Sequence, residues 1–176
     1  MFVLAAAAIT LGCREAPVEP PQAAPEAKRH ARVQVADAEA LRGVMAAAAG
    51  RATLVNIWAT WCGPCVEEMP DLIRVYRAYE SRGLAFVSLS ADLAAGTSEQ
   101  VAPFAEEHAI PFAIHVLDGI PPDEVAALLG VAETDWDGAL PATFLFDAAG
   151  ALRQSWFTAV DYAALDAAIR PLLAGG

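Results

Sequence analysis

The stretch TLVNIWATWCGPCVEEMP, residues 53–70, decides the fold of this 176-residue chain. Its apolar start, Thr53 to Trp58, is rich in side chains that suit a buried central strand. The strand pattern runs directly into Cys62-Gly63-Pro64-Cys65, where a helical pattern begins. Pro64 fits this early helix position, because its missing amide costs little there. The sequence therefore predicts two cysteines at a strand-to-helix turn.

The spacing of these cysteines favours redox chemistry. Residues three apart lie on one face of a helix, so the two sulfurs are within range to close a small disulfide ring. The unpaired amides of the helix N-terminus stabilise a thiolate, the form of cysteine that attacks a disulfide. We expect Cys62 to be the attacking nucleophile and Cys65 the resolving thiol.

Two structural roles for the pair are weaker alternatives. Structural zinc needs four ligands, and the chain has no second cysteine pair; His108 and His115 show no ligand spacing. An inert disulfide between Cys62 and Cys65 would close a loop too small to constrain much of the unfolded chain. We therefore expect no metal and no cofactor.

The rest of the chain alternates short apolar runs with longer amphipathic ones, which predicts an α/β fold. The expected strands are Arg32 to Val35, Thr53 to Trp58, Leu84 to Ser90, Phe112 to Val116, Thr143 to Phe146 and Leu152 to Phe157. The expected helices are Asp37 to Ala49, Cys62 to Tyr79, Thr97 to His108, Pro122 to Leu129 and Tyr162 to Leu173. Asp37, Thr97 and Asp161 are the expected helix N-caps, and Asp147-Ala-Ala-Gly150 the expected hairpin turn.

The first 13 residues are interpreted as a signal segment. Residues 1–12 carry no charge and are too short to span a bilayer, which fits the core of a signal peptide. Gly12-Cys13 resembles the lipobox of bacterial lipoproteins, in which the cysteine becomes lipidated, and this would explain the odd cysteine. Thr10 stands where that pattern prefers Leu, and no Lys or Arg precedes the run. A plain cleaved signal, an uncleaved anchor or a buried Cys13 therefore remain alternatives.

Residues 14–30 are expected to form a tether. They are rich in Pro, Ala and Glu, a composition that favours extended, solvated backbone and cannot pack a core. At about 3.1 Å per residue, such a segment could hold a domain up to roughly 50 Å from a membrane. The folded domain is expected to cover residues 31–176.

Charge excludes one class of partner. A net charge of −11 and a pI near 4.5 argue against nucleic acid, which is bound by clustered Lys and Arg. No Lys or Arg occurs between Arg82 and Arg153, whereas acidic residues are frequent there. This segment is either an ordinary solvated acidic face or a surface that steers basic partners.

The run NIWATWCGPCVEEMP, residues 56–70, resembles the active-site segment of TlpA-like and ResA-like proteins, extracytoplasmic thioredoxins often involved in cytochrome c maturation. The similarity covers residues 31–175. It implies a thioredoxin fold, in which helices flank both faces of a central mixed β-sheet. It also implies a thiol-disulfide oxidoreductase of the protein-disulfide reductase type.

The resemblance assigns roles to residues outside the cysteine motif. Leu140-Pro141-Ala142-Thr143 matches the family's cis-proline segment, so Pro141 would shape the substrate groove and the Leu140 backbone would pair with an extended substrate. Glu68 matches an acidic residue thought to handle protons or tune the redox pair; the alternative is an ordinary carboxylate near a helix N-terminus. Asn56 stands where cytosolic thioredoxins carry a buried Asp, which leaves Glu68 as the better proton-transfer candidate.

The substrate groove is expected to include residues beside the cysteines. Gly63 and Pro64 lie between them, and Trp61 would form a partly exposed wall, while Trp58 is expected in the core. Trp136 lies in an acidic loop just before Pro141; because loops beside a site often carry specificity, it is a candidate groove residue for contact with a partner, and simple packing is the other interpretation.

The resemblance also suggests partners and a location. The substrates would be proteins with cysteine pairs, such as apocytochrome c or a copper-site assembly protein, and a membrane electron donor of the DsbD or CcdA type would restore the dithiol. The protein would be a monomer in the periplasm or at the outer face of the cytoplasmic membrane, anchored by a lipid on Cys13. Gly-Pro between the cysteines resembles reducing thioredoxins more than the oxidising DsbA-type Cys-Pro-His-Cys.

Two other functions use the same cysteines. A peroxiredoxin-like peroxidase wants a Pro-x-x-x-Thr-x-x-Cys motif, and the residues leading to Cys62 lack that proline. A Sco-like copper chaperone would bind copper with Cys62, Cys65 and a histidine, but Sco-like proteins usually separate the cysteines by three residues instead of two.

Overall fold

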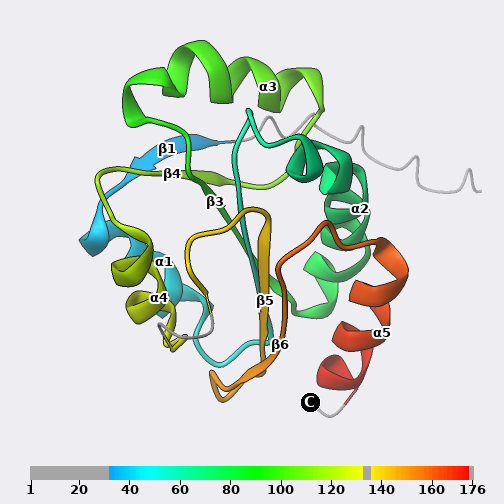
Figure 1. The fold of residues 1–176 in the computed structure, drawn as a ribbon. Helices are drawn as coiled ribbons and strands as arrows, with labels where there is room; N and C mark the ends of the chain where they lie inside the picture. Colours follow the sequence, from blue (N-terminus) through cyan, green and yellow to red (C-terminus); the bar gives the residue numbers. More distant parts are fainter. Residues whose placement is uncertain (1–31, 133–135, 175–176) are drawn as a thin grey trace, which may run out of the picture.

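The computed structural model describes residues 32–132 and 136–174 (Figure 1). Within them, one six-stranded sheet has the order β1-β4-β3-β2-β5-β6. The strands are β1 (Val33–Ala36), β2 (Thr53–Trp58), β3 (Ala85–Ser90), β4 (Ile114–Leu117), β5 (Ala142–Phe146) and β6 (Leu152–Trp156). The first four pair in parallel, and β5 runs antiparallel to both β2 and β6. The sheet is mixed, as expected.

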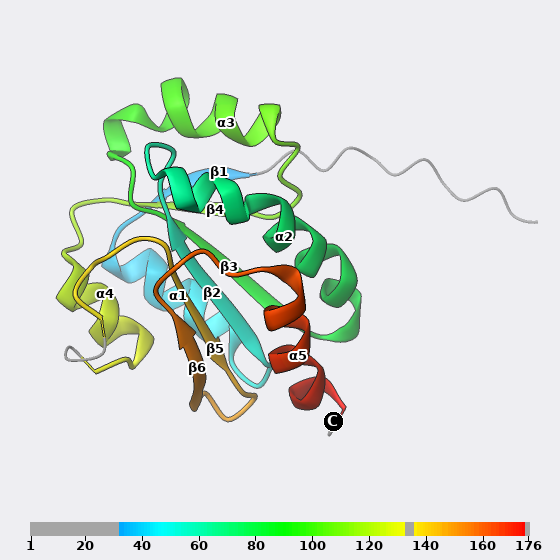
Figure 2. The same cartoon turned by 45° about the vertical axis from the view of Figure 1, so that its right-hand side comes forward.

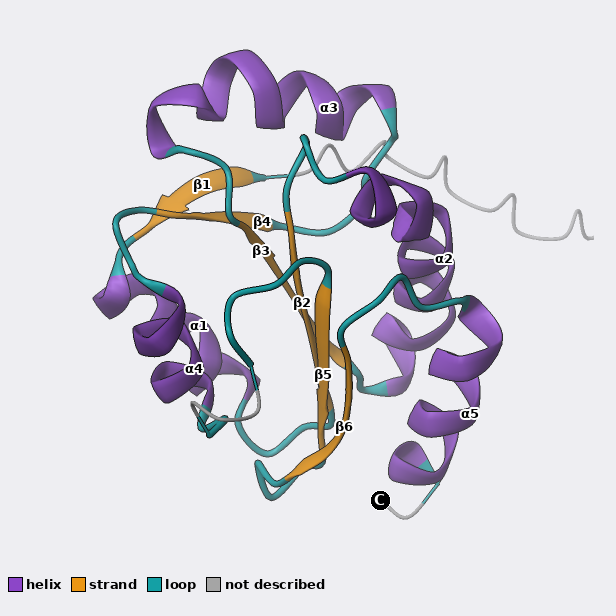
Figure 3. Cartoon of the chain, viewed as in Figure 1, coloured by secondary structure: helices purple, strands orange, loops and turns teal. Residues whose placement is uncertain are grey.

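Helices cover both faces of this sheet (Figures 1, 2 and 3). One face carries α2 (Gly63–Tyr79) and α5 (Tyr162–Leu173), and the other carries α1 (Ala38–Ala48) and α4 (Pro122–Leu129). A π-helical turn at Thr97–Val101 continues into α3 (Ala102–Glu107). This arrangement confirms the expected α/β thioredoxin-like fold.

Several sequence expectations lie outside the described residues. They are the signal segment of residues 1–13, Cys13 with its lipidation, and the tether of residues 14–30. These remain predictions. No helix among the described residues is both long and apolar enough to span a bilayer.

The central strand β2 joins two cores. Leu54 and Trp58 face α2 and α5, whereas Val55 and Ile57 face α1 and α4, because successive side chains of a strand point to opposite faces. All six residues of β2 are buried, as predicted for a strand covered on both sides. The indole of Trp58 donates to the Ser88 hydroxyl at 2.8 Å, which confirms its expected core position.

Helix caps follow the sequence signals at two of three places. Asp37 accepts from the Ala40 amide at 2.9 Å, and Asp161 accepts from the Ala164 amide at 2.8 Å. Thr97 is not an N-cap: its backbone is already helical, and its hydroxyl donates to the Ala94 carbonyl at 2.7 Å. The expectation fails because a 3₁₀ turn at Ala94–Gly96 starts the helical segment before Thr97.

The predicted hairpin turn joins β5 to β6. The Asp147 carboxylate accepts from the amides of Ala149 and Ala151, both at 2.9 Å, and Gly150 has a φ of 80°. Glycine suits this position because it has no Cβ to oppose a left-handed backbone. The turn lies at the sheet edge opposite the cysteine motif, since Phe146 pairs with Thr53.

One buried histidine makes folding sensitive to pH. His115 of β4 is buried, and Gln34 of the neighbouring β1 lies at 2.9 Å from its Nδ1. Burial lowers the pKa of His115 from its ordinary value of 6.5, because it disfavours the charged imidazolium. The folded protein therefore binds fewer protons at this residue than the unfolded chain just below pH 6.5.

We expect His115 to make the free energy of unfolding fall as the pH drops below 6.5. A His115→Gln variant should lose this pH dependence. Above pH 6.5, its free energy of unfolding should differ from that of wild type by a constant amount. Urea denaturation across a pH series measures both slopes. Equal slopes for the two proteins below pH 6.5 would show that His115 does not contribute.

Candidate active site

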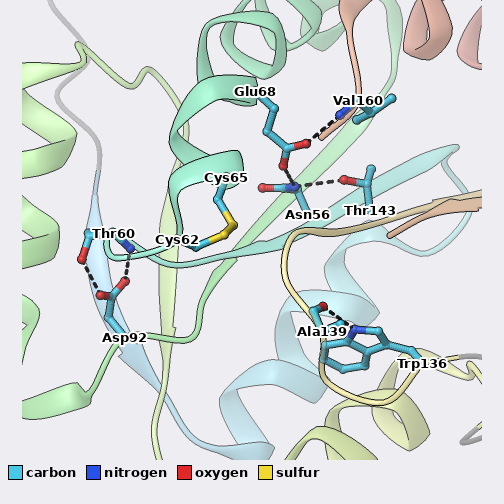
Figure 4. The surroundings of a disulfide bond; sticks show 10 residues. All are labelled: Asn56, Thr60, Cys62, Cys65, Glu68, Asp92, Trp136, Ala139, Thr143 and Val160. Atoms are coloured by element: carbon cyan, nitrogen blue, oxygen red, sulfur yellow. Dashed lines mark hydrogen bonds between the residues drawn. A yellow bond between two sulfur atoms is a disulfide. The ribbon is translucent and has the colours of Figure 1, made fainter. Parts of the chain in front are cut away.

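The two predicted cysteines form a disulfide at the start of α2 (Figure 4). Their Cα atoms lie 5.3 Å apart. Cys62 is the N-cap residue and its carbonyl accepts from the Val66 amide at 3.1 Å, so the free amides of the first turn lie next to its sulfur. Cys62 is 7% exposed and Cys65 is 0% exposed. Of the two, only Cys62 is reachable from solvent, which suits an attacking thiol in front of a resolving one.

Glu68 lies one turn further along α2 and is buried (Figure 4). Its Oε1 accepts from the Asn56 side-chain amide at 2.8 Å, and its Oε2 accepts from the Val160 amide at 3.0 Å. Burial raises the pKa of Glu68 from 4.5 to about 7, although both hydrogen bonds favour the carboxylate and lower it. The loss of hydration is therefore the larger effect. Glu68 is poised to change protonation near neutral pH.

Asn56 extends this contact to the proline segment. Its Nδ2 also donates to the Thr143 hydroxyl at 3.0 Å, across the pairing of β2 with β5. Thr143 follows Pro141 by two residues, and the Leu140-Pro141 peptide bond is cis, as the resemblance implied. Pairing of Ile57 with Ala142 places Pro141 at the sheet edge from which Cys62 emerges. Polar contacts thus join the helix of the cysteines to the strand that follows Pro141.

A second buried carboxylate holds the turn that precedes Cys62 (Figure 4). Asp92, two residues beyond β3, accepts from the Thr60 amide at 3.0 Å and from the Thr60 hydroxyl at 2.6 Å. The Ser90 hydroxyl also donates to it at 2.7 Å. Asp92 was not predicted from the sequence as a site residue. Its position after a buried parallel strand was the available signal, because ligands and reactive groups gather at the carboxyl ends of such strands.

The tryptophans near the site differ from each other in exposure. Trp61 is 68% exposed beside Cys62, as expected for a wall residue. Trp136 is only 6% exposed, and its indole donates to the Ala139 carbonyl at 2.8 Å. Its ring also packs edge-on against Phe144, with centroids 5.9 Å apart. These contacts favour packing of the loop before Pro141, the alternative to a partner contact for Trp136.

Three other expected groove residues are at least partly accessible to solvent. Gly63 and Pro64 are exposed between the cysteines, and Leu140 is half-buried beside the cis peptide bond. Among the described residues, no three His, Cys, Asp or Glu side chains are placed to hold a metal ion. His115 lies on β4 with Gln34, so the copper-chaperone alternative gains no third ligand from it.

Known sequences are similar to this chain. The model of the AhpC/TSA family matches residues 22–155. The thiol-disulfide oxidoreductase ResA of Bacillus anthracis is 31% identical over 101 residues, which are 57% of this chain and 51% of that protein. The ResA of Geobacillus thermodenitrificans is 32% identical over 105 residues, 60% of this chain and 53% of that protein. The chain thus spans about half the length of the curated relatives it matches.

Solved structures share the fold. A thioredoxin-related protein from Neisseria meningitidis serogroup B is 27% identical with a TM-score of 0.57, covering 70% of this chain and 86% of that one. A thiol:disulfide interchange protein of the thioredoxin family from Chlorobium tepidum is 25% identical with a TM-score of 0.59. That likeness covers 73% of this chain and 83% of the Chlorobium protein.

We expect Glu68 to destabilise the folded protein as the pH rises through about 7. The folded state binds more protons at Glu68 than the unfolded chain between pH 4.5 and about 7, so stability is greatest below that window. The shift corresponds to about 3 kcal/mol across the window. In denaturant unfolding of the oxidised protein, Glu68→Gln should remove this dependence of the free energy of unfolding on pH. The variant also loses one hydrogen-bond acceptor, which lowers its stability at every pH.

Glu67→Gln is the matched control, because Glu67 is the exposed neighbour on the same helix. This variant should keep the wild-type slope. The assignment is wrong if Glu68→Gln and wild type lose stability in parallel as the pH rises.

Proposed function

Because the chain belongs to the AhpC/TSA family, we propose that it is a thiol-disulfide oxidoreductase of the ResA type that reduces disulfides in partner proteins. The observation that carries the proposal is the Cys62–Cys65 disulfide at the N-terminus of α2, in which Cys62 keeps a small exposed area and Cys65 has none. The names of the ResA relatives support the same chemistry.

The reaction starts from the dithiol form of the protein. The Cys62 thiolate attacks one sulfur of the partner's disulfide; a new S–S bond forms, and the partner's other sulfur leaves as a thiolate that takes up a proton. Cys65 then loses its proton and attacks the Cys62 sulfur, which releases the second partner thiol and closes the Cys62–Cys65 disulfide. Two electrons and two protons pass to the partner in total.

Glu68 fits the second step. Cys65 must lose a proton inside the protein, where it is fully buried and away from bulk water. Glu68 lies one helical turn away with a pKa of about 7, so near neutral pH it can accept a proton and return it. We infer that Glu68, through its contact with Asn56, takes part in moving the Cys65 proton.

The partners and location are part of the proposal. A membrane electron donor of the DsbD or CcdA type would return the protein to its dithiol form after each turnover. The substrates would be apocytochrome c or a copper-site assembly protein, encountered outside the cytoplasm. Lipidation of Cys13 would keep the domain near that donor.

We expect a Cys65→Ser variant to accumulate mixed disulfides through Cys62, because no resolving thiol remains to release the partner. Expression in its own cell envelope, acid quenching and non-reducing electrophoresis measure these adducts. A Cys62→Ser, Cys65→Ser double variant should show none. Wild type should also reduce insulin disulfides. The proposal is wrong if no Cys62-dependent adduct forms and insulin remains oxidised; stoichiometric Cu(I) uptake would then favour the copper chaperone.

The role of Glu68 predicts a change in the pH profile. For pre-reduced wild type, the rate of peptide disulfide reduction should show an inflection near 7, where Glu68 titrates. Glu68→Gln should lose that inflection, and Glu67→Gln should keep it. Rapid mixing with acid quench at a series of pH values measures the profile. A Glu68→Gln profile that keeps the inflection would assign it to another group.

A further inference from the structure

Asp92 brings the segment after β3 against the turn that leads to Cys62. The parallel pairing of β2 and β3 matches Trp58 with Ser90, and the Ala91 amide donates to the Trp58 carbonyl at 2.8 Å. Beyond these strands, both carboxylate oxygens of Asp92 accept from Thr60. The next residues of the two joined segments are Trp61 and Leu93. Trp61 and Leu93 therefore each come directly after one of the two residues in the Thr60–Asp92 contact, and Cys62 follows Trp61.

Both of these residues are strongly exposed. Leu93 is 80% exposed and Trp61 is 68% exposed, the two highest values among the large hydrophobic residues that the structure describes. The other exposed members of that group are Val35, on the outer strand β1, and Phe157, whose ring packs on Phe144. A leucine exposed to this extent does not stabilise the hydrophobic core. Leu93 directly follows Asp92, whose contact with Thr60 precedes the exposed Trp61 and then Cys62, and such a placement is typical of a contact surface.

Exposed carboxylates follow or precede the strand ends at the side of the sheet from which Cys62 emerges. The carboxyl ends of β3 and β4 and the start of β5 share the edge of the sheet from which Cys62 emerges. Exposed carboxylates follow or precede these strand ends at Asp118, Asp123, Glu124 and Asp137. Arg51 and Arg153 lie instead at the opposite edge, where Arg51 donates to the Leu84 carbonyl and Arg153 pairs with Asp147. These carboxylates, in a chain with a net charge of −11, favour the approach of positively charged segments.

We propose that Leu93 is a substrate-contact residue that, together with Trp61, receives an apolar side chain next to the reacting disulfide of a basic partner segment. The inference rests on the proposed oxidoreductase function and adds the chemistry of its substrates. Trp61 and Leu93 bury apolar surface of the partner, and the surrounding carboxylates attract its Lys and Arg. A cysteine pair flanked by apolar and basic residues is then reduced in preference to one flanked by polar or acidic residues.

The test is a double-mutant cycle between Leu93 and the substrate. The first substrate is a synthetic peptide with one internal disulfide, a Leu next to the attacked cysteine, and Lys residues outside it. The second peptide has Ser in place of that Leu. Pre-reduced wild type, Leu93→Ser and Val35→Ser are mixed with each peptide, and alkylation of the released thiols gives the rate constants.

We expect Leu93→Ser to lower the rate constant about tenfold with the Leu peptide and much less with the Ser peptide, because only the first loses an apolar contact. Val35→Ser, a change of an exposed apolar residue on β1, should behave as wild type with both. Leu93 is too exposed for its replacement to disturb folding. A loss of the same size with both peptides would overturn the role of Leu93.

A third peptide with Glu in place of Lys tests the charge. Wild type should reduce it more slowly than the Lys peptide, and added salt should narrow the difference by screening. Equal rates with the Lys and Glu peptides would overturn the basic character of the partner. If wild type reduces none of the three peptides, the proposed function itself is contradicted.

Discussion

The arrangement of the site depends on the buried Glu68 carboxylate. One oxygen holds Asn56 of β2 and the other holds the Val160 amide before α5, a residue 92 positions away in the chain. Asn56 passes the link to Thr143 of β5, just beyond the cis peptide bond. A methyl or amide group could not accept at both places. Burial of the Glu68 carboxylate costs folding free energy. The same carboxylate fixes the helix of the cysteines relative to the strand that follows Pro141.

Local signals explain why much of the fold and half of the site could be predicted from the sequence. The run from Thr53 to Cys65 contains a strand, a turn and a helix start in contiguous residues, so its structure depends little on the rest of the chain. Asp37, Asp161 and the turn at Asp147 likewise bond to amides within four residues. Such contacts are written into short stretches of sequence.

What the sequence did not reveal depends on strand order. Asp92 contacts Thr60 only because β3 lies beside β2, and the spacing of residues along the chain does not predict this strand pairing. Trp136 was a candidate for partner contact because it lies in a loop beside the site, yet its ring packs against Phe144 and its indole donates to the Ala139 carbonyl within the loop. Thr97 failed as a cap since the helical path had already begun at Ala94. In each case a tertiary contact or a preceding turn outweighed a local preference.

His115 and Glu68 exchange protons with the solvent in opposite directions when the chain folds. Near pH 6, Glu68 gains a proton on folding because its pKa rises to about 7, whereas His115 gives one up because its pKa falls from 6.5. The two residues therefore contribute with opposite signs to the proton balance of folding. A mildly acidic environment alters the ionisation of a residue beside the cysteines, and it favours the folded state at Glu68 while it disfavours that state at His115.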